Sequence, residues 1–255
     1  MNFSKAIVRR PGRSIVNGLS TSAHETLDYE KALAQHEQYI KALEYCQLNV
    51  EVLDCLEPYP DSTFVEDVAV LTPDCAIITA PGAPSRQGEI KAIKPVLENH
   101  HYDHIENVHA PGTLEGGDIM QIGRCCYIGL SKRTNTFGAE QLMTILKQYD
   151  MTAVPIPVTG FLHLKTAVTY VGQETILVAE GFVLSKELEV FDKIQVTRDE
   201  HPAANCILIN DKILMPSGFP KTRGRLETLG AEIVEVDISE FAKIDGGLTC
   251  LSLRF

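Results

Sequence analysis

The sequence predicts a mixed α/β fold built from repeated units. Short apolar segments occur in pairs, and the residues between the paired segments are turn formers, which predicts β-hairpins. Other segments carry apolar residues at helical spacing. The strand pairs begin about 40–50 residues apart, so five units fit within the chain. On this spacing alone, a radial or solenoid array and an ordinary α/β sheet both stay open.

The elements follow in chain order. Strands are expected at 5–9, at 67–71 with 76–79, at 118–122 with 125–128, at 167–171 with 175–179, at 205–209 with 212–215, and at 248–253. Helices are expected at about 25–47, 86–99, 137–149 and 220–229. No low-complexity tract or long Gly/Ser-rich or Pro-rich linker divides the chain, so residues 1–255 are expected to form a single domain.

Composition and charge narrow the class of partner. The 255 residues are 44% hydrophobic and 22% charged, which is typical of a globular enzyme. A net charge of −11 disfavours nucleic acid or an anionic membrane as partner and suits a cationic small molecule. No apolar run of roughly 20 residues and no secretory signal are found, so a cytoplasmic protein without a membrane span is expected.

The cysteines do not indicate a disulfide framework or a metal site. There are seven, an odd number without framework spacing, so free thiols are expected. Neither CxxC nor HExxH occurs, and the glycines lack the spacing of a phosphate-binding loop. The sequence therefore predicts no bound metal or nucleotide.

Polar residues next to glycine mark the starts of several expected strands. They include Asp67, Glu115, His163 and Cys250, and a radial array would bring these four positions together at its axis. Each also has a purely structural interpretation. Cys250 could be a small buried hydrophobic residue, and His163 could be a hydrogen-bonded residue of the core. The functional alternative is a cysteine nucleophile with a histidine acid/base.

Five segments, in order along the chain, resemble those of the dimethylarginine dimethylaminohydrolase family. They are Phe64-Val-Glu-Asp-Val-Ala, Thr113-Leu-Glu-Gly-Gly-Asp, Gly129-Leu-Ser-Lys-Arg-Thr-Asn, Leu162-His-Leu-Lys-Thr-Ala and Asp245-Gly-Gly-Leu-Thr-Cys-Leu-Ser. The resemblance extends over the whole chain. It implies the fold of the guanidine-modifying superfamily, a five-bladed pseudo-symmetric α/β propeller (pentein) of repeated ββαβ units, which agrees with the spacing of the strand pairs.

The resemblance also implies a role for each matching residue. Cys250 is expected to be the nucleophile, His163 the general acid/base and Glu115 the carboxylate that supports the site. Substrate contacts are expected from Leu19 in a lid loop, from Asp61 and Ile244 near the α-amino group, from Phe64 in the pocket wall, from Glu66 and Asp67 at the guanidinium, and from Arg86 and Arg133 at the α-carboxylate.

The implied activity is hydrolysis of N-omega-methylated arginine to citrulline and an alkylamine through a covalent thiouronium on cysteine, with no cofactor and no metal. The alternatives are an arginine or guanidine deiminase or an amidinotransferase of the same superfamily, and a non-catalytic guanidine-binding protein. Relatives occur as monomers and as dimers, so a homodimer is among the expected states. The sequence does not rank dimethylated, monomethylated and unmethylated arginine.

Overall fold

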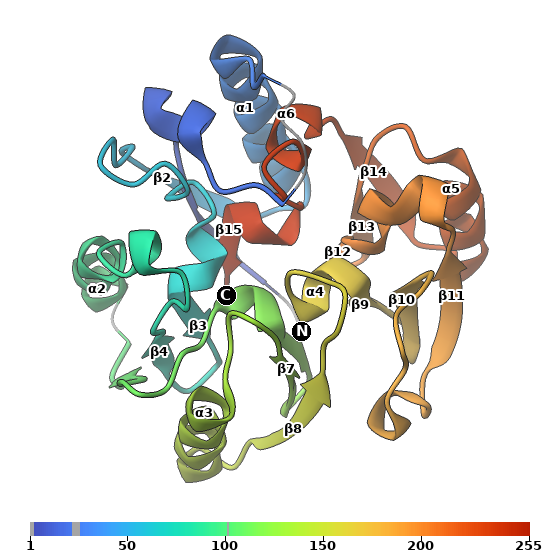
Figure 1. The fold of residues 1–255 in the computed structure, drawn as a ribbon. Helices are drawn as coiled ribbons and strands as arrows, with labels where there is room; N and C mark the ends of the chain where they lie inside the picture. The colour runs from blue at the N-terminus through green and yellow to red at the C-terminus, as the bar shows by residue number, and fades with distance from the viewer. Residues whose placement is uncertain (1–2, 22–25, 101) are drawn as a thin grey trace.

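Five small sheets are arranged around a central axis (Figure 1). The computed structural model describes residues 3–21, 26–100 and 102–255. In every sheet the middle strand pairs antiparallel with one neighbour and parallel with the other. This radial arrangement confirms the predicted five-bladed α/β fold and excludes a single continuous sheet.

Each sheet belongs to one repeated unit. Unit 1 contains β15 (Ser252–Arg254), β1 (Lys5–Arg9), α1 (Tyr29–Tyr45) and β2 (Asn49–Leu53). Unit 2 contains β3 (Ala69–Leu71), β4 (Ala76–Ile78), α2 (Ile90–Asn99) and β5 (Ile105–Asn107). Unit 3 contains β6 (Ile119–Ile122), β7 (Cys125–Leu130), α3 (Thr136–Gln148) and β8 (Thr152–Pro157).

The last two units complete the ring. Unit 4 follows the short helix α4 (Leu164–Ala167) and contains β9 (Val168–Gly172), β10 (Thr175–Ala179) and β11 (Asp192–Val196). Unit 5 contains β12 (Ile207–Ile209), β13 (Lys212–Pro216), α5 (Pro220–Leu226) and β14 (Glu232–Val236), and the short helix α6 (Ser239–Ala242) follows it.

The two ends of the chain close the ring together. Strand β15 pairs antiparallel with β1, and Leu253 lies opposite Ile7. Ile7 is fully buried and Leu253 nearly so. The hairpin-like pair that the other units form from neighbouring segments is therefore made in unit 1 by the first and last strands.

Helices α1, α2 and α3 lie on the outer rim and pack against the sheets (Figure 1). On α1 the fully buried side chains include Tyr39 and Leu43, and α3 buries Leu142 and Leu146 in the same way. Helix α1 begins at Tyr29, where the side chain of Asp28 accepts a hydrogen bond from the first turn. Residue 25, the expected start, lies outside the described residues. No helix in the described part of the chain has the length and apolar content needed to span a membrane.

Two features differ from the sequence-based expectation. The third, outer strand of each unit (β2, β5, β8, β11 and β14) agrees with the ββαβ unit that the resemblance implies, but the sequence pattern did not locate it, and these strands are largely half-buried or exposed. The inner strand of each unit (β3, β6, β9, β12 and β15) also begins later than expected. Polar residues such as Asp67 and Asp118 belong to short helical turns that come directly before the strands.

Candidate active site

Short helical turns meet at the centre of the ring, one before the inner strand of each unit. They are Val65–Val68, Gly116–Asp118, α4, Arg198–Ala204 and Thr249–Leu251. The first of these contacts the turns at 116–118 and 249–251, and α4 contacts the turns at 116–118 and 198–204. The turns therefore bring residues from all five units to one place.

One cavity opens at this meeting point. Nine of the eleven predicted site residues line it: Leu19, Asp61, Phe64, Asp67, Arg86, Arg133, His163, Ile244 and Cys250. Ser20, Thr21, Leu162, Asp245 and Gly246 complete the lining. The structure thus gathers residues of which some lie more than 200 positions apart in the sequence.

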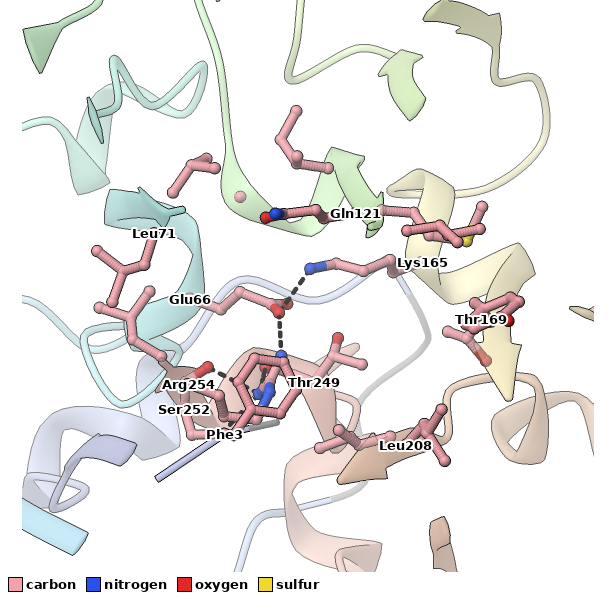
Figure 2. Close-up of a pocket in the computed structure, with 18 of the residues that line it drawn as sticks. Phe3, Glu66, Leu71, Gln121, Lys165, Thr169, Leu208, Thr249, Ser252 and Arg254 are labelled. Atoms are coloured by element: carbon pink, nitrogen blue, oxygen red, sulfur yellow. Dashed lines mark hydrogen bonds and ion pairs between the residues drawn. The ribbon is translucent and has the colours of Figure 1, made fainter. Parts of the chain in front are cut away.

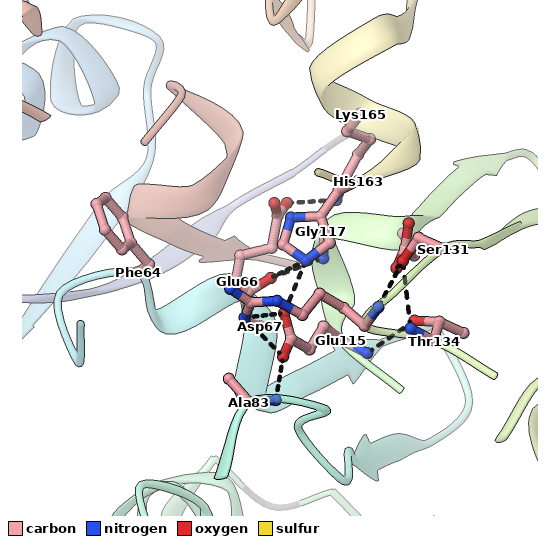
Figure 3. A network of polar contacts seen from close by, with 12 residues as sticks. Phe64, Glu66, Asp67, Ala83, Glu115, Gly117, Ser131, Thr134, His163 and Lys165 are labelled. Atoms are coloured by element: carbon pink, nitrogen blue, oxygen red, sulfur yellow. Dashed lines mark hydrogen bonds and ion pairs between the residues drawn. The ribbon is translucent and has the colours of Figure 1, made fainter. Parts of the chain in front are cut away.

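Glu115 lies behind the cavity wall and links the predicted acid/base to an arginine. It is fully buried, and its Oε2 is 2.7 Å from Nε2 of His163. Nη1 of Arg133 donates to both carboxylate oxygens at 3.2 Å. The backbone N–H of Ala83 donates to Oε1 at 3.2 Å (Figure 3). These contacts hold the imidazole in one orientation.

The electrostatics of this pair favour a charged histidine and a charged carboxylate. Burial by itself would lower the pKa of His163, but the carboxylates of Asp67 and Glu115 outweigh it and raise this pKa to about 9. Burial by itself would raise the pKa of Glu115, but the hydrogen bond and charge of His163 lower it to about 2. At neutral pH, His163 is therefore an imidazolium that can donate a proton.

Asp67 and Arg86 form a second buried network beside the histidine. Oδ1 of Asp67 accepts from the backbone N–H of Gly117 at 2.9 Å and lies 4.0 Å from Nε2 of His163. Its Oδ2 accepts from Nη1 of Arg86. Arg86 also donates from Nε and Nη2 to the two oxygens of Glu89, at 3.0 and 2.8 Å. Arg86 is thus fixed in the wall by two carboxylates.

Cys250 lies in the turn Thr249–Leu251 and is 5% exposed. Burial raises the pKa of its thiol to about 12, and the nearby charges of Asp67 and Glu66 act in the same direction. The thiol is therefore protonated in the unliganded protein at neutral pH. A cation placed beside it would favour the thiolate.

The loop that carries Leu19 is held over the cavity by two carboxylates. Oδ1 of Asp61 accepts from the backbone N–H of Leu19 at 2.9 Å. Asp245 accepts from the backbone N–H and the hydroxyl of Thr21, at 2.6 and 3.0 Å. Leu19 itself is 40% exposed. The loop is therefore attached by polar contacts and not by packing of its leucine.

Glu66 is the one predicted residue whose side chain faces elsewhere. Its Oε1 accepts from Nζ of Lys165 and, at 2.9 Å, from Nη2 of Arg254. All three residues line a separate cavity that also includes Gln121, Thr169 and Leu208 (Figure 2). The expectation that Glu66 and Asp67 act as a pair at the substrate therefore does not fit the geometry, and only Asp67 faces the first cavity.

Two supporting residues were not singled out from the sequence. Asp118 is fully buried and accepts from the backbone N–H of Leu164 at 2.9 Å and from the hydroxyl of Ser131 at 2.7 Å. The Ser131 oxygen in turn accepts from the backbone N–H of Arg133 at 2.9 Å. Asp118 and Ser131 both lie within motifs that carried the resemblance, but the contacts of Asp118 join segments that are far apart in sequence.

One group of described residues has the geometry to hold a metal ion. Ligand atoms of Asp67, Glu115 and His163 all lie within 4.8 Å of one another. The side chains of these residues are engaged with Arg86, with Arg133 and with each other. We therefore interpret the group as a hydrogen-bonded network.

Comparisons with known proteins agree with this geometry. A family model described as N,N dimethylarginine dimethylhydrolase, eukaryotic, matches residues 16–252. The N(G),N(G)-dimethylarginine dimethylaminohydrolase of Pseudomonas aeruginosa is 44% identical over 253 residues, which cover 99% of this chain and 100% of the relative. The protein of the same name from Streptomyces coelicolor is 36% identical over 256 residues, covering 100% of this chain and 98% of the relative.

Solved structures give the same result. A mutant of the P. aeruginosa protein in complex with citrulline has a TM-score of 0.98 at 43% identity and covers 100% of both chains. The N-terminal domain of a cyanobacterial arginine dihydrolase is 18% identical, with a TM-score of 0.89 over 98% of this chain and 97% of the other, and supports the fold alone. The resemblance carried by the five motifs is confirmed: the chain belongs to the dimethylarginine dimethylaminohydrolase family.

Proposed function

We propose that this protein hydrolyses N-omega-methylated arginine to citrulline and an alkylamine, with Cys250 as the nucleophile. The observation that carries the proposal is the shared cavity of Cys250, His163 and Asp67, with Arg133 also in its lining. Family membership supports the same activity, since relatives of known structure include an adduct with S-methyl-L-thiocitrulline. Dimethyl- and monomethylarginine are both proposed substrates.

Substrate binding is the first step. The guanidinium is proposed to lie against Asp67, whose carboxylate forms a charge-assisted hydrogen bond with it and orients its face toward the sulfur. The α-carboxylate is proposed to lie toward Arg133 and Arg86. Asp61 and the backbone of Ile244 are proposed to take the α-amino group, with Phe64 as the wall and Leu19 as the cover.

Bond formation follows from the charge of the bound substrate. The guanidinium offsets the negative charge of Asp67 near Cys250 and lowers the pKa of the thiol, which loses its proton to solvent water, so that the thiolate attacks the central guanidinium carbon. The tetrahedral adduct then breaks its bond to the methylated nitrogen. His163, protonated at neutral pH, donates the proton that this amine needs to leave. An S-linked thiouronium intermediate on Cys250 remains.

Hydrolysis of the intermediate restores the enzyme. His163 is now neutral and takes a proton from a water molecule, whose oxygen attacks the same carbon. The second adduct breaks its bond to sulfur as its hydroxyl proton passes to the departing thiolate, which releases citrulline with its new C=O and returns Cys250 to the thiol. Glu115 keeps the imidazole oriented during both steps through its 2.7 Å contact. All of these proton transfers use groups of this chain, the substrate and water.

Turnover of defined guanidines tests the proposal. Purified protein is offered asymmetric dimethylarginine, monomethylarginine, arginine and agmatine, and both citrulline and the released amine are measured. We expect citrulline with dimethylamine or methylamine. Ammonia from arginine alone would indicate a deiminase, and transfer to an acceptor amine would indicate an amidinotransferase. A Cys250→Ser variant should bind substrate without turnover, and normal activity in that variant would refute the mechanism.

Three further properties are proposed on more general grounds. We infer that residues 1–255 act as one catalytic domain, because β15 pairs with β1 and closes the ring. A cytoplasmic location is supported by the seven free cysteines. The family resemblance supports a homodimer as one of the expected states. The net charge of −11 supports the absence of nucleic-acid partners. Sedimentation of the purified protein tests the oligomeric state.

A further inference from the structure

Unit 5 also places a polar residue at the axis, and no role in the reaction has been assigned to it. Asn205 comes directly after the turn Arg198–Ala204 and before β12. Asn205 lies two residues before its strand, as Asp67 does in unit 2 and Cys250 does in unit 1. Asn205 is 4% exposed and does not line the active-site cavity.

The side-chain amide of Asn205 contacts two of the catalytic turns at once. Its Nδ2 donates to the backbone carbonyl of Lys165 at 2.7 Å and to the hydroxyl of Thr249 at 3.1 Å. Its Oδ1 accepts from the backbone N–H of Thr249 at 2.9 Å. Lys165 lies in α4, two residues after His163, and Thr249 directly precedes Cys250. Both hydrogens of the amide and its oxygen are therefore used.

These two turns need an external link, because neither is stiff by itself. Helix α4 has four residues and the turn at Thr249 has three. Within the described residues, no hydrogen bond joins the side chains of His163 and Cys250 directly. The start of α4 is held by Asp118 through the backbone N–H of Leu164. Asn205 supplies a second attachment at the carbonyl of Lys165 and joins it to Thr249, next to the cysteine.

The chain before Cys250 is shaped to accept the asparagine. A Cβ at Gly247 would overlap the side-chain oxygen of Asn205, so this position requires glycine for close approach. The backbone of Gly247 in turn accepts from the N–H of Cys250 at 3.2 Å. Asn205 thus packs directly against the segment that sets the direction of the nucleophile.

We propose that Asn205 is a positioning residue that fixes the nucleophile Cys250 relative to the acid/base His163. The inference rests on the proposed function, since it assigns those two roles. Its consequence is specific: loss of the amide misplaces the reacting groups and leaves the binding groups Arg133 and Asp67 where they are. The effect should therefore fall on the chemical step and not on substrate binding.

The test compares kcat and KM for dimethylarginine in Asn205→Ala and in the wild type. Because misplacement by about 1 Å can cost on the order of a hundredfold, we expect kcat to fall about 10- to 100-fold. KM should change by no more than about threefold, because uniform binding is retained. The alkaline limb of the pH profile should stay in place, since Asn205 carries no charge.

Two milder variants keep the test decisive if Asn205→Ala folds poorly. Asn205→Asp retains an acceptor for the Thr249 N–H and loses both donated bonds, so kcat should still fall. Thr249→Val keeps the side-chain shape and removes one contact, so a smaller fall is expected. Thr222→Val is the matched control, because Thr222 is 1% exposed and its hydroxyl donates to Glu200 at 2.7 Å, outside the site.

The outcomes separate this inference from the proposed function. Wild-type turnover of methylarginine tests the function by itself. If the wild type is active and the folded Asn205→Ala and Asn205→Asp variants keep its kcat, the positioning role is refuted. It is equally refuted if Thr222→Val, at a similar loss of melting temperature, loses as much kcat as the Asn205 variants. A fall in kcat confined to the Asn205 and Thr249 variants supports it.

Discussion

The alkaline limit of activity should be set by His163 and should move when Glu115 loses its charge. His163 has a pKa raised to about 9, and Glu115 lies 2.7 Å from it with no exposure to solvent. An opposite charge this close typically raises the pKa of a cationic group by about 1–3 units, or roughly 1.4–4 kcal/mol. Glu115→Gln removes this stabilisation of the imidazolium. The pKa of His163 should therefore fall, and activity should be lost at a lower pH.

The assay is kcat/KM for dimethylarginine between about pH 6 and pH 10, because this ratio reports the free enzyme. In the wild type the ratio should decline above about pH 9, as the acid form of His163 is lost. In Glu115→Gln the decline should begin about 1–3 units lower. Glu115→Asp is the control. In this variant kcat should fall, but the decline of kcat/KM should stay near its wild-type pH, because the negative charge is kept. If kcat/KM of Glu115→Gln begins to decline at the wild-type pH or at a higher pH, the reasoning is refuted.

Three other changes probe the rest of the site. Gly117→Ala places a Cβ 2.6 Å from Nδ1 of His163, so the ring must move, and kcat should drop by about tenfold or more in steady-state assays. Arg133→Gln removes the charged hydrogen bond that we propose to the α-carboxylate, so KM for amino-acid substrates should rise about 10- to 100-fold, whereas KM for agmatine should change less. Binding of an amidine analogue of arginine near pH 10 should release protons from Cys250, measured with a pH indicator, because a fall of about 1–3 units from a pKa of about 12 brings the thiol into this range, and the release should be larger than in Cys250→Ser.

The repeat could be predicted because its inner strands are buried. Strand β10 (Thr175–Ala179), for example, is buried throughout and apolar after its first residue, and such a short apolar run is a strong local signal. The outer strand β2 (Asn49–Leu53) follows a helix, is mostly exposed and alternates with polar residues, so its signal is weak. Its place in the sheet depends on parallel pairing with β1, a contact between distant segments that the local sequence does not encode.

It could also be predicted that the site residues come together, but the directions of their side chains could not be predicted. Glu66 and Asp67 are neighbours in a 3-10 turn, where successive side chains point about 120° apart. One carboxylate therefore faces Cys250 and Arg86, and the other faces Lys165 in the second cavity. Adjacent acidic residues suggest a joint role in the sequence, whereas the turn geometry separates them.

The resting charge state of the site explains why the cysteine is buried among carboxylates. Burial disfavours a permanently ionised thiolate, the charge of Asp67 adds to this effect, and the pKa of Cys250 is accordingly raised to about 12. Asp67, together with Glu115, also raises the pKa of His163 and keeps it protonated. The unliganded site thus holds an unreactive thiol and a ready proton donor. A cation bound at Asp67 makes the thiolate more favourable, because it adds positive charge beside Cys250. In the proposed mechanism, nucleophile activation is therefore coupled to recognition of the guanidinium, and a neutral ligand of the same shape should leave Cys250 protonated.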